Sequence, residues 1–119
     1  DIAVQHERSP LYVQLSDGHV RNNYTMKLRN METRPRPVEI RVSGLGGAQL
    51  WTDRGSRETA AQRLTMTLAP DSVTSVKLFI AAPGAGPARQ DFTIETRGLD
   101  GDPRADSDTI QFDRPETGQ

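Results

Sequence analysis

The sequence contains no cysteine. Disulfides, iron–sulfur clusters and zinc sites with cysteine ligands are therefore excluded in this chain, and so is thiol redox chemistry. We accordingly expect no cofactor bound to this polypeptide. The absence leaves the cellular compartment open, because bacterial envelope domains can lack disulfides and cytosolic domains do not need them.

Long hydrophobic runs are also missing. The longest apolar run covers only residues 78–82, whereas a membrane span needs ~20 such residues. No signal peptide is recognisable, and the chain opens on Asp1. We therefore expect it to be part of a larger protein.

An excess of one charge is lacking too. Fifteen Lys and Arg residues face sixteen Asp and Glu residues, which gives a net charge of −1. The charged residues are scattered singly and form no basic stripe, so nucleic acid is not an expected partner. Aromatic residues make up only 5% of the chain, which is poor stacking material for a carbohydrate-binding module.

What the sequence does contain is a hydrophobic period of two, which is typical of strands. The clearest case is residues 20–28, where Val20, Asn22, Tyr24, Met26 and Leu28 alternate with polar residues. Similar alternation occurs over residues 11–15, 38–42, 64–68, 76–80, 92–94 and 110–112, with turn signals at 16–18, 34–37, 44–47 and 69–71. Seven or eight short strands with one dry face predict an immunoglobulin-like β-sandwich of two antiparallel sheets, with a small closed barrel as the alternative.

The chain is long enough for one domain, which we place at residues 1–114, followed by a frayed polar tail at 115–119. The predicted interior consists of Tyr24, Met26, Leu28, Ile40, Val42, Leu64, Leu78, Ile80, Ile94 and Phe112. The first half of the 20–28 strand is polar on both faces, so burial should begin near Tyr24. Residues 52–62 are expected to form a long connection, with one turn of helix over 56–62 as the alternative.

One segment has a distinctive order of residues. Residues 5–18 read Gln-His-Glu-Arg-Ser-Pro-Leu-Tyr-Val-Gln-Leu-Ser-Asp-Gly, and residues 20–25 read Val-Arg-Asn-Asn-Tyr-Thr. This pattern resembles the C-terminal immunoglobulin-like domain of the FixG/CcoG/RdxA family of cytochrome c oxidase (cbb3-type) accessory proteins. Weaker similarity continues through residues 38–45, 68–73 and 79–83.

The resemblance implies a parent protein larger than this chain. Members of the family are integral membrane proteins whose cytoplasmic region holds 4Fe–4S clusters, and they help to assemble the cbb3-type oxidase by reducing copper(II) to copper(I). Their C-terminal domain lies in the periplasm. The resemblance therefore implies a soluble domain on the periplasmic side of the bacterial inner membrane. Its partners would be the membrane-embedded remainder of the parent and oxidase-assembly or copper-handling proteins.

The first functional hypothesis is a non-catalytic interaction module. No nucleophile–base constellation is recognisable, so we expect no catalytic residue and no enzyme activity in this chain. Trp51, Phe79 and Arg21 are the interaction candidates, because aromatic residues and arginine dominate binding hot spots. Phe79 lies on the polar side of its strand, where it is either exposed or covered by a second layer.

Two further hypotheses assign a ligand to the chain. The first is a direct copper-binding or copper-transfer module, for which His6, His19 and Met31 are the candidate ligands. The other methionines fall at core positions and no His-x-His or Met-x-Met cluster exists, so we expect no metal site. Asp106 and Asp108 could offer oxygens to calcium, but no EF-hand pattern surrounds them. The second is a carbohydrate-binding or adhesin-like β-sandwich.

Overall fold

The computed structural model describes residues 2–101 and 105–116. Within them the strands are β1 (Ile2–His6), β2 (Val13–Gln14), β3 (His19–Asn30), β4 (Arg36–Ser43), β5 (Gln49–Thr52), β6 (Arg63–Leu68), β7 (Ser72–Pro83), β8 (Arg89–Gly98) and β9 (Ala105–Asp113). The only helical element of this part is one 3-10 turn, η1 (Arg57–Thr59). None of these residues belongs to a helix long and apolar enough to cross a bilayer.

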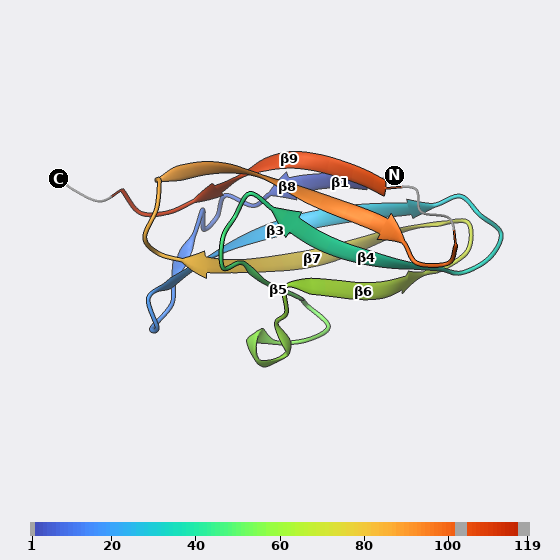
Figure 1. Cartoon of the computed structure of the whole chain (residues 1–119), viewed down its shortest axis with the longest axis horizontal. Coiled ribbons are helices and arrows are strands. Elements are labelled where there is room, and N and C mark those ends of the chain that lie inside the picture. Colours follow the sequence, from blue (N-terminus) through green and yellow to red (C-terminus); the bar gives the residue numbers. More distant parts are fainter. Residues whose placement is uncertain (1, 102–104, 117–119) are drawn as a thin grey trace.

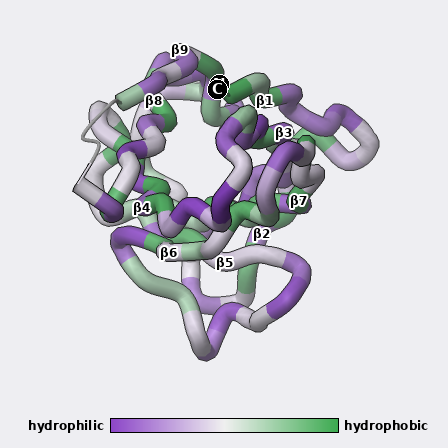
Figure 2. The backbone as a smooth tube through the Cα atoms, turned by 90° about the vertical axis from the view of Figure 1, so that its right-hand side faces the viewer, coloured by the Kyte–Doolittle hydropathy of each residue, from purple (hydrophilic) through white to green (hydrophobic). Residues whose placement is uncertain are grey.

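The strands form two antiparallel sheets that lie face to face (Figure 1). The first sheet has the order β1-β3-β7-β5, with β2 also paired to β3, and the second has the order β6-β4-β8-β9. Viewed along the long axis, hydrophobic and hydrophilic residues alternate along the strands that enclose the interior (Figure 2). The predicted immunoglobulin-like sandwich is therefore confirmed, with nine described strands instead of seven or eight.

The core lies between the sheets where the alternation placed it. Of the predicted core residues only Val42 and Leu64 are half-buried, and both pack against the fully buried cluster. Two elements differ from the sequence pattern. The sequence does not indicate β1, because its three apolar residues, Ile2, Ala3 and Val4, follow one another without alternation. The predicted 11–15 strand shrinks to two residues, Val13–Gln14.

The expectation that burial begins near Tyr24 is wrong. Val20 is 3% exposed and Asn22 is fully buried. The side-chain amide of Asn22 pairs with the backbone of Asp113 in β9: its Nδ2 donates to the carbonyl oxygen at 2.9 Å, and its Oδ1 accepts from the N–H at 2.8 Å. The polar residue is tolerated inside because both of its functional groups are satisfied.

Polar side chains pair with backbone groups at the neighbouring edges of β1 and β9. The hydroxyl of Tyr24 donates to the carbonyl oxygen of Gln111 at 2.8 Å, as expected for a core tyrosine that reaches the edge. Conversely, side chains of β9 reach the backbone of β1: the carboxylates of Asp106 and Asp108 accept from the N–H groups of Ile2 and Val4 at 2.9 and 3.3 Å. The oxygens considered for calcium thus serve to cap a strand edge.

The connections follow the turn signals. Gly18 has a φ of +89° in the predicted 16–18 turn, a conformation that favours glycine. Residues 52–62 form the expected long connection, and η1 occupies one turn of it. The predicted frayed tail at 115–119 lies mostly outside the described residues, which end at 116.

Arg114 fastens the end of β9 to the connection that crosses from β7 to β8. Arg114 is only 5% exposed. Its Nε donates to the carbonyl oxygen of Pro83 at 2.9 Å, and its Nη1 donates to the carbonyl oxygen of Pro87 at 3.1 Å. The guanidinium also lies 5.0 Å from the ring centroid of Phe112. One buried cation therefore holds both ends of an inter-sheet connection that precedes it by more than twenty residues.

Candidate functional site

The three predicted interaction residues lie together on the outer face of the first sheet. Phe79 in β7 is paired in register with Trp51 in β5, and their rings stack with centroids 5.6 Å apart at 22°. From β3, the guanidinium of Arg21 lies 5.4 Å from the Phe79 ring centroid. Arg21 also donates from Nε to the side-chain oxygen of Asn23 at 3.0 Å, which fixes its orientation. We call Arg21, Phe79 and Trp51 the aromatic–arginine stack.

The stack exists because of sheet register. Odd-numbered residues of β3 and β7 point outward, since their even-numbered neighbours fill the core. Arg21, Phe79 and Trp51 come from three adjacent strands, so they meet only when all three strands are aligned. Residue type alone indicates the three as interaction candidates, whereas only the strand register places them side by side.

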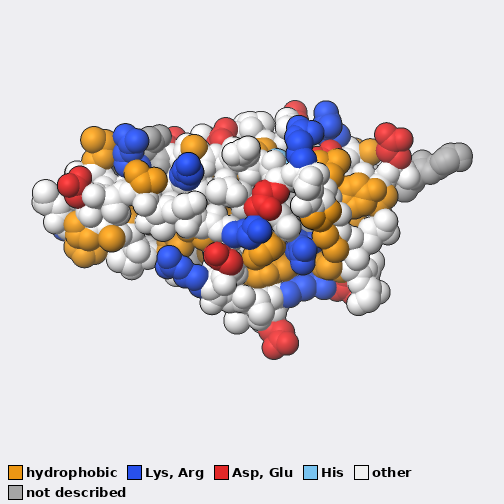
Figure 3. Space-filling model, turned by 180° about the vertical axis from the view of Figure 1, so that it is seen from behind, with side chains coloured by type: hydrophobic (Ala, Val, Ile, Leu, Met, Phe, Trp, Pro, Cys, Tyr) orange, Lys and Arg blue, Asp and Glu red, His pale blue; other side chains and the backbone are white. Residues whose placement is uncertain are grey.

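Exposure within the stack is graded. Trp51 is only 7% exposed, whereas Phe79 and Arg21 are half-buried. Phe79 thus lies between the two alternatives considered for it, with one face covered by Trp51. In the view from behind, hydrophobic side chains are interspersed with Lys and Arg side chains on the half of the molecule nearer the C terminus (Figure 3). A planar cation on an aromatic ring is suited to contacting a protein surface through stacking and carboxylate pairing.

The side chain of His6, a candidate copper ligand, is only 7% exposed. Its ring stacks on Tyr24 with centroids 4.6 Å apart, and its Nδ1 lies 3.4 Å from Oδ2 of Asp113. Burial lowers the pKa of His6 below 6.5, although the nearby Asp113 carboxylate acts in the opposite direction. The Nε2 atom is buried without a hydrogen-bond partner. This imidazole is packed as an aromatic ring within the wall of the sandwich.

The other two candidate copper ligands lie at opposite ends of β3. His19 begins the strand, with Nδ1 3.2 Å from Oδ1 of Asp17. Arg57 from the long connection donates to the other oxygen of Asp17 at 2.7 Å, and this hydrogen bond lowers the pKa of Asp17 to about 2. Met31 follows the last residue of β3 and is 75% exposed.

A twelve-residue strand separates the two, a span of roughly 40 Å. The structure therefore does not bring His19 and Met31 together, and His6 pairs with Tyr24 near the middle of the same strand. Over residues 2–101 and 105–116, no group of three or more His, Cys, Asp or Glu side chains is arranged to hold a metal ion. A copper ion at any one of these residues would have a single protein ligand from the candidate set.

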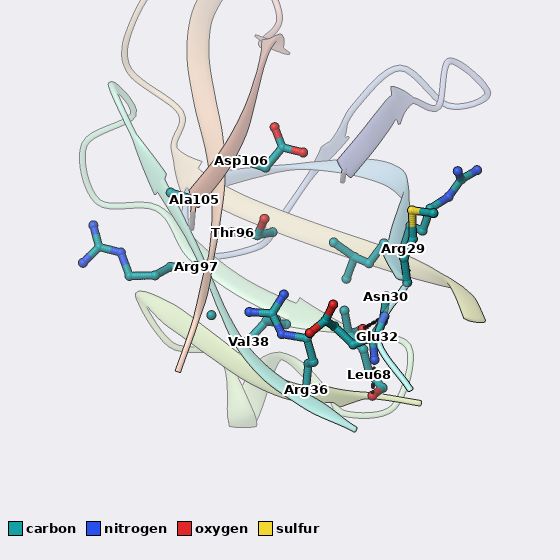
Figure 4. Close-up of a pocket in the computed structure, with 13 residues that line it drawn as sticks. Arg29, Asn30, Glu32, Arg36, Val38, Leu68, Thr96, Arg97, Ala105 and Asp106 are labelled. Atoms are coloured by element: carbon teal, nitrogen blue, oxygen red, sulfur yellow. Dashed lines mark hydrogen bonds between the residues drawn. The ribbon is translucent and has the colours of Figure 1, made fainter. Parts of the chain in front are cut away.

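A cavity of about 370 Å³ opens at the end of the sandwich where β3 ends and β4 begins (Figure 4). Leu28, Val38 and Leu68 line its apolar part. Arg36 also lines it, but its guanidinium is held by Asp100 at 3.1 and 3.2 Å. The side chains of other arginines at the rim point away from the cavity (Figure 4). No pattern in the sequence indicates this cavity, because its lining comes from strands far apart in the chain.

These features define an immunoglobulin-like sandwich domain that carries the aromatic–arginine stack on the outer face of one sheet. Residues 1–115 match the model of the family described as the IG-like fold at the C-terminal of FixG, a candidate oxidoreductase. The chain therefore belongs to this family of FixG C-terminal domains, as its sequence pattern suggested.

Relatives from two bacteria support the assignment. The chain is 35% identical over 83 residues to nitrogen fixation protein FixG of Rhizobium meliloti, covering 70% of this chain and 16% of that protein. It is 39% identical over 89 residues to protein RdxA of Cereibacter sphaeroides, covering 74% of this chain and 18% of that protein. This chain thus spans less than a fifth of the length of either relative.

A solved structure shares the fold. A FixG-related protein from Vibrio parahaemolyticus superposes with a TM-score of 0.74 at 18% identity, covering 96% of this chain and 94% of that chain. The chain of that structure is therefore about as long as this one. At this level of identity the likeness shows the fold alone.

Proposed function

We propose that this chain is a non-catalytic, periplasmic interaction domain of a membrane-bound iron–sulfur protein of the FixG type. In this proposal the parent reduces copper(II) to copper(I) during assembly of the cbb3-type oxidase, and the domain provides a docking surface. The observation that carries the proposal is the family match over residues 1–115 in a chain that contains no cysteine. Cluster-based electron transfer must then reside elsewhere in the parent.

The aromatic–arginine stack is the proposed contact surface. Hot spots in protein interfaces are enriched in tryptophan, tyrosine and arginine, and they combine a covered aromatic base with an accessible rim. Trp51 supplies the covered base, and the half-buried Phe79 and Arg21 supply the accessible part. The partner that fits is the membrane-embedded remainder of the parent or an oxidase-assembly protein with an acidic patch.

The alternatives receive less support from the same residues. A copper-transfer role would have to use His19 or Met31 singly, because they lie at opposite ends of β3. A carbohydrate-binding role needs an open aromatic platform, whereas Trp51 is 7% exposed and covered by Phe79 on one face.

The test uses the full-length parent in its own host. We expect Arg21→Glu combined with Phe79→Ser to lower the yield of assembled cbb3-type oxidase several-fold, as deletion of the whole domain should. Arg41→Ala is the matched control, because Arg41 lies on the outer face of the other sheet and its partner is Glu95 at 2.8 Å. Normal oxidase yield in the double variant would remove the stack from the docking surface.

The copper alternative is tested in parallel. His19→Asn and Met31→Leu should leave copper delivery unchanged, and the isolated domain should retain no copper(I) against a competing chelator. Stoichiometric copper(I) binding that either substitution abolishes would make the metal role primary.

A further inference from the structure

The edge strands of the two sheets differ in how far their outward backbone groups are hydrogen-bonded. The edges of β1 and β9 are capped by the side chains of Asp106, Asp108, Asn22 and Tyr24. The edge of β5 is bridged at Leu50, whose N–H and C=O both pair with Ala61 at 2.8 and 3.0 Å. The same bridge holds the chain two residues before β6, but from Arg63 onward β6 pairs with β4 on one side and with no other strand of the described chain. An uncapped edge strand is a template for further strand pairing.

The backbone pattern shows which groups of β6 are free to pair. Leu99 donates to the carbonyl oxygen of Pro37, so odd-numbered residues of β4 direct their backbone groups toward β8. Even-numbered residues of β4 therefore bond to β6, where they are paired with Leu64, Met66 and Leu68. Arg63, Thr65 and Thr67 consequently direct their N–H and C=O groups away from the sheet.

This outward edge is complementary to itself. In an antiparallel pair of two β6 strands centred on Thr65, Thr65 faces Thr65 of the second copy, and Arg63 faces Thr67. All three positions carry outward backbone groups, so the pair can form about six hydrogen bonds. Cross-strand threonine pairs are favourable, and no like charges face each other in this register.

The inward-facing side chains of β6 are also compatible with this strand pairing. Leu64 and Met66 point toward the core but are only half-buried, because the neighbouring sheet has no strand beyond β5 to cover them. In the register centred on Thr65, Leu64 of one copy lies opposite Met66 of the other. Pairing therefore covers apolar surface that each copy leaves partly open.

We propose that two copies of this chain associate through β6, antiparallel and centred on Thr65, so that two four-stranded sheets become one eight-stranded sheet. The contact is one short strand per copy, which is far below the area of a stable dimer. The dimer is therefore weak, with a dissociation constant of ~10 μM to 1 mM.

The first experiment is sedimentation equilibrium on the 119-residue chain from roughly 10 μM to 1 mM, the range the proposal sets. Thr65→Asp and Thr65→Lys each place like charges across the twofold axis and should weaken the dimer at least tenfold. An equimolar mixture of the two variants should restore association, because Asp then faces Lys. Circular dichroism melts establish that each variant is folded.

Thr67→Asp is the matched control for register. Its carboxylate would face Arg63 of the second copy, so the dimer should be unweakened or tighter. A monomer up to 1 mM would overturn the proposal and leave the edge to a strand of another protein. Equal weakening by Thr65→Asp and Thr67→Asp would overturn the register.

A cross-linking experiment gives an independent readout, because the chain has no cysteine of its own. Thr65→Cys should form an intermolecular disulfide under mild oxidation, since directly paired residues have Cα atoms about 5.5 Å apart. Thr67→Cys should not, since in this register its symmetry mate lies roughly 13 Å along the strand. Equally fast cross-linking of both variants would contradict the twofold pairing.

Discussion

Replacing Asn22 by alanine tests whether a side chain can substitute for a missing strand neighbour. The amide makes two hydrogen bonds to the backbone of Asp113, at 2.8 and 2.9 Å, and Asn22 is fully buried. Removing it loses two bonds worth ~0.5–1.5 kcal/mol each and strands a buried N–H and a buried C=O. We expect the free energy of unfolding to fall by ~2–5 kcal/mol.

The measurement is urea unfolding followed by tryptophan fluorescence, with Asn23→Ala as the control. Asn23 is the adjacent residue on the outer face and accepts a single bond from Arg21 at 3.0 Å. It should cost ~1 kcal/mol or less. With a typical m-value of ~1–3 kcal/mol/M, Asn22→Ala should lower the urea midpoint by ~1–3 M. Equal midpoints for the two variants would refute the idea that Asn22 completes the β9 edge.

Three further outcomes are expected. Leu78→Ala removes a fully buried side chain from the core and should lower the free energy of unfolding by ~2–5 kcal/mol in the same urea assay. A decrease of less than ~0.5 kcal/mol would mean that the inward face of β7 is misassigned. Burial lowers the pKa of His6 below 6.5, so the unfolded chain binds a proton at this residue more readily than the folded chain. The free energy of unfolding should therefore fall as the pH drops through 6.5. The same pH dependence in His6→Phe would contradict this. Gly86 has a φ of +147°, and a Cβ there would lie 2.8 Å from Cζ of Arg114. Gly86→Ala should therefore lower the thermal midpoint by several degrees. Gly46→Ala is the control and should not lower it, because the space around Gly46 is open.

The layered fold was accessible from the sequence because one physical signal dominates it. Alternating burial over β3, β4 and β7 places large apolar residues on one face, and a period of two leaves little choice of structure. Asn22 was misread for the same reason. A polar residue at an inward position looks like a solvated one until the strand that satisfies it, β9, is brought across the sandwich.

The surface features depended on information that the sequence does not carry locally. Arg21, Phe79 and Trp51 could be chosen by residue type, but their stacking needs the register of three strands. β1 has no alternating pattern of its own, and its edge is completed by Asp106 and Asp108, about one hundred residues later. Long-range pairing of this kind decides which edges of the sandwich are closed.

Arg114 couples the end of β9 mechanically to the connection between β7 and β8. A pulling force applied beyond residue 114 passes first to the carbonyl groups of Pro83 and Pro87 and not to the β9 ladder alone. The load is then shared by the connection between β7 and β8, two strands that belong to different sheets. Tension at this terminus therefore pulls both layers together before it can peel the last strand away.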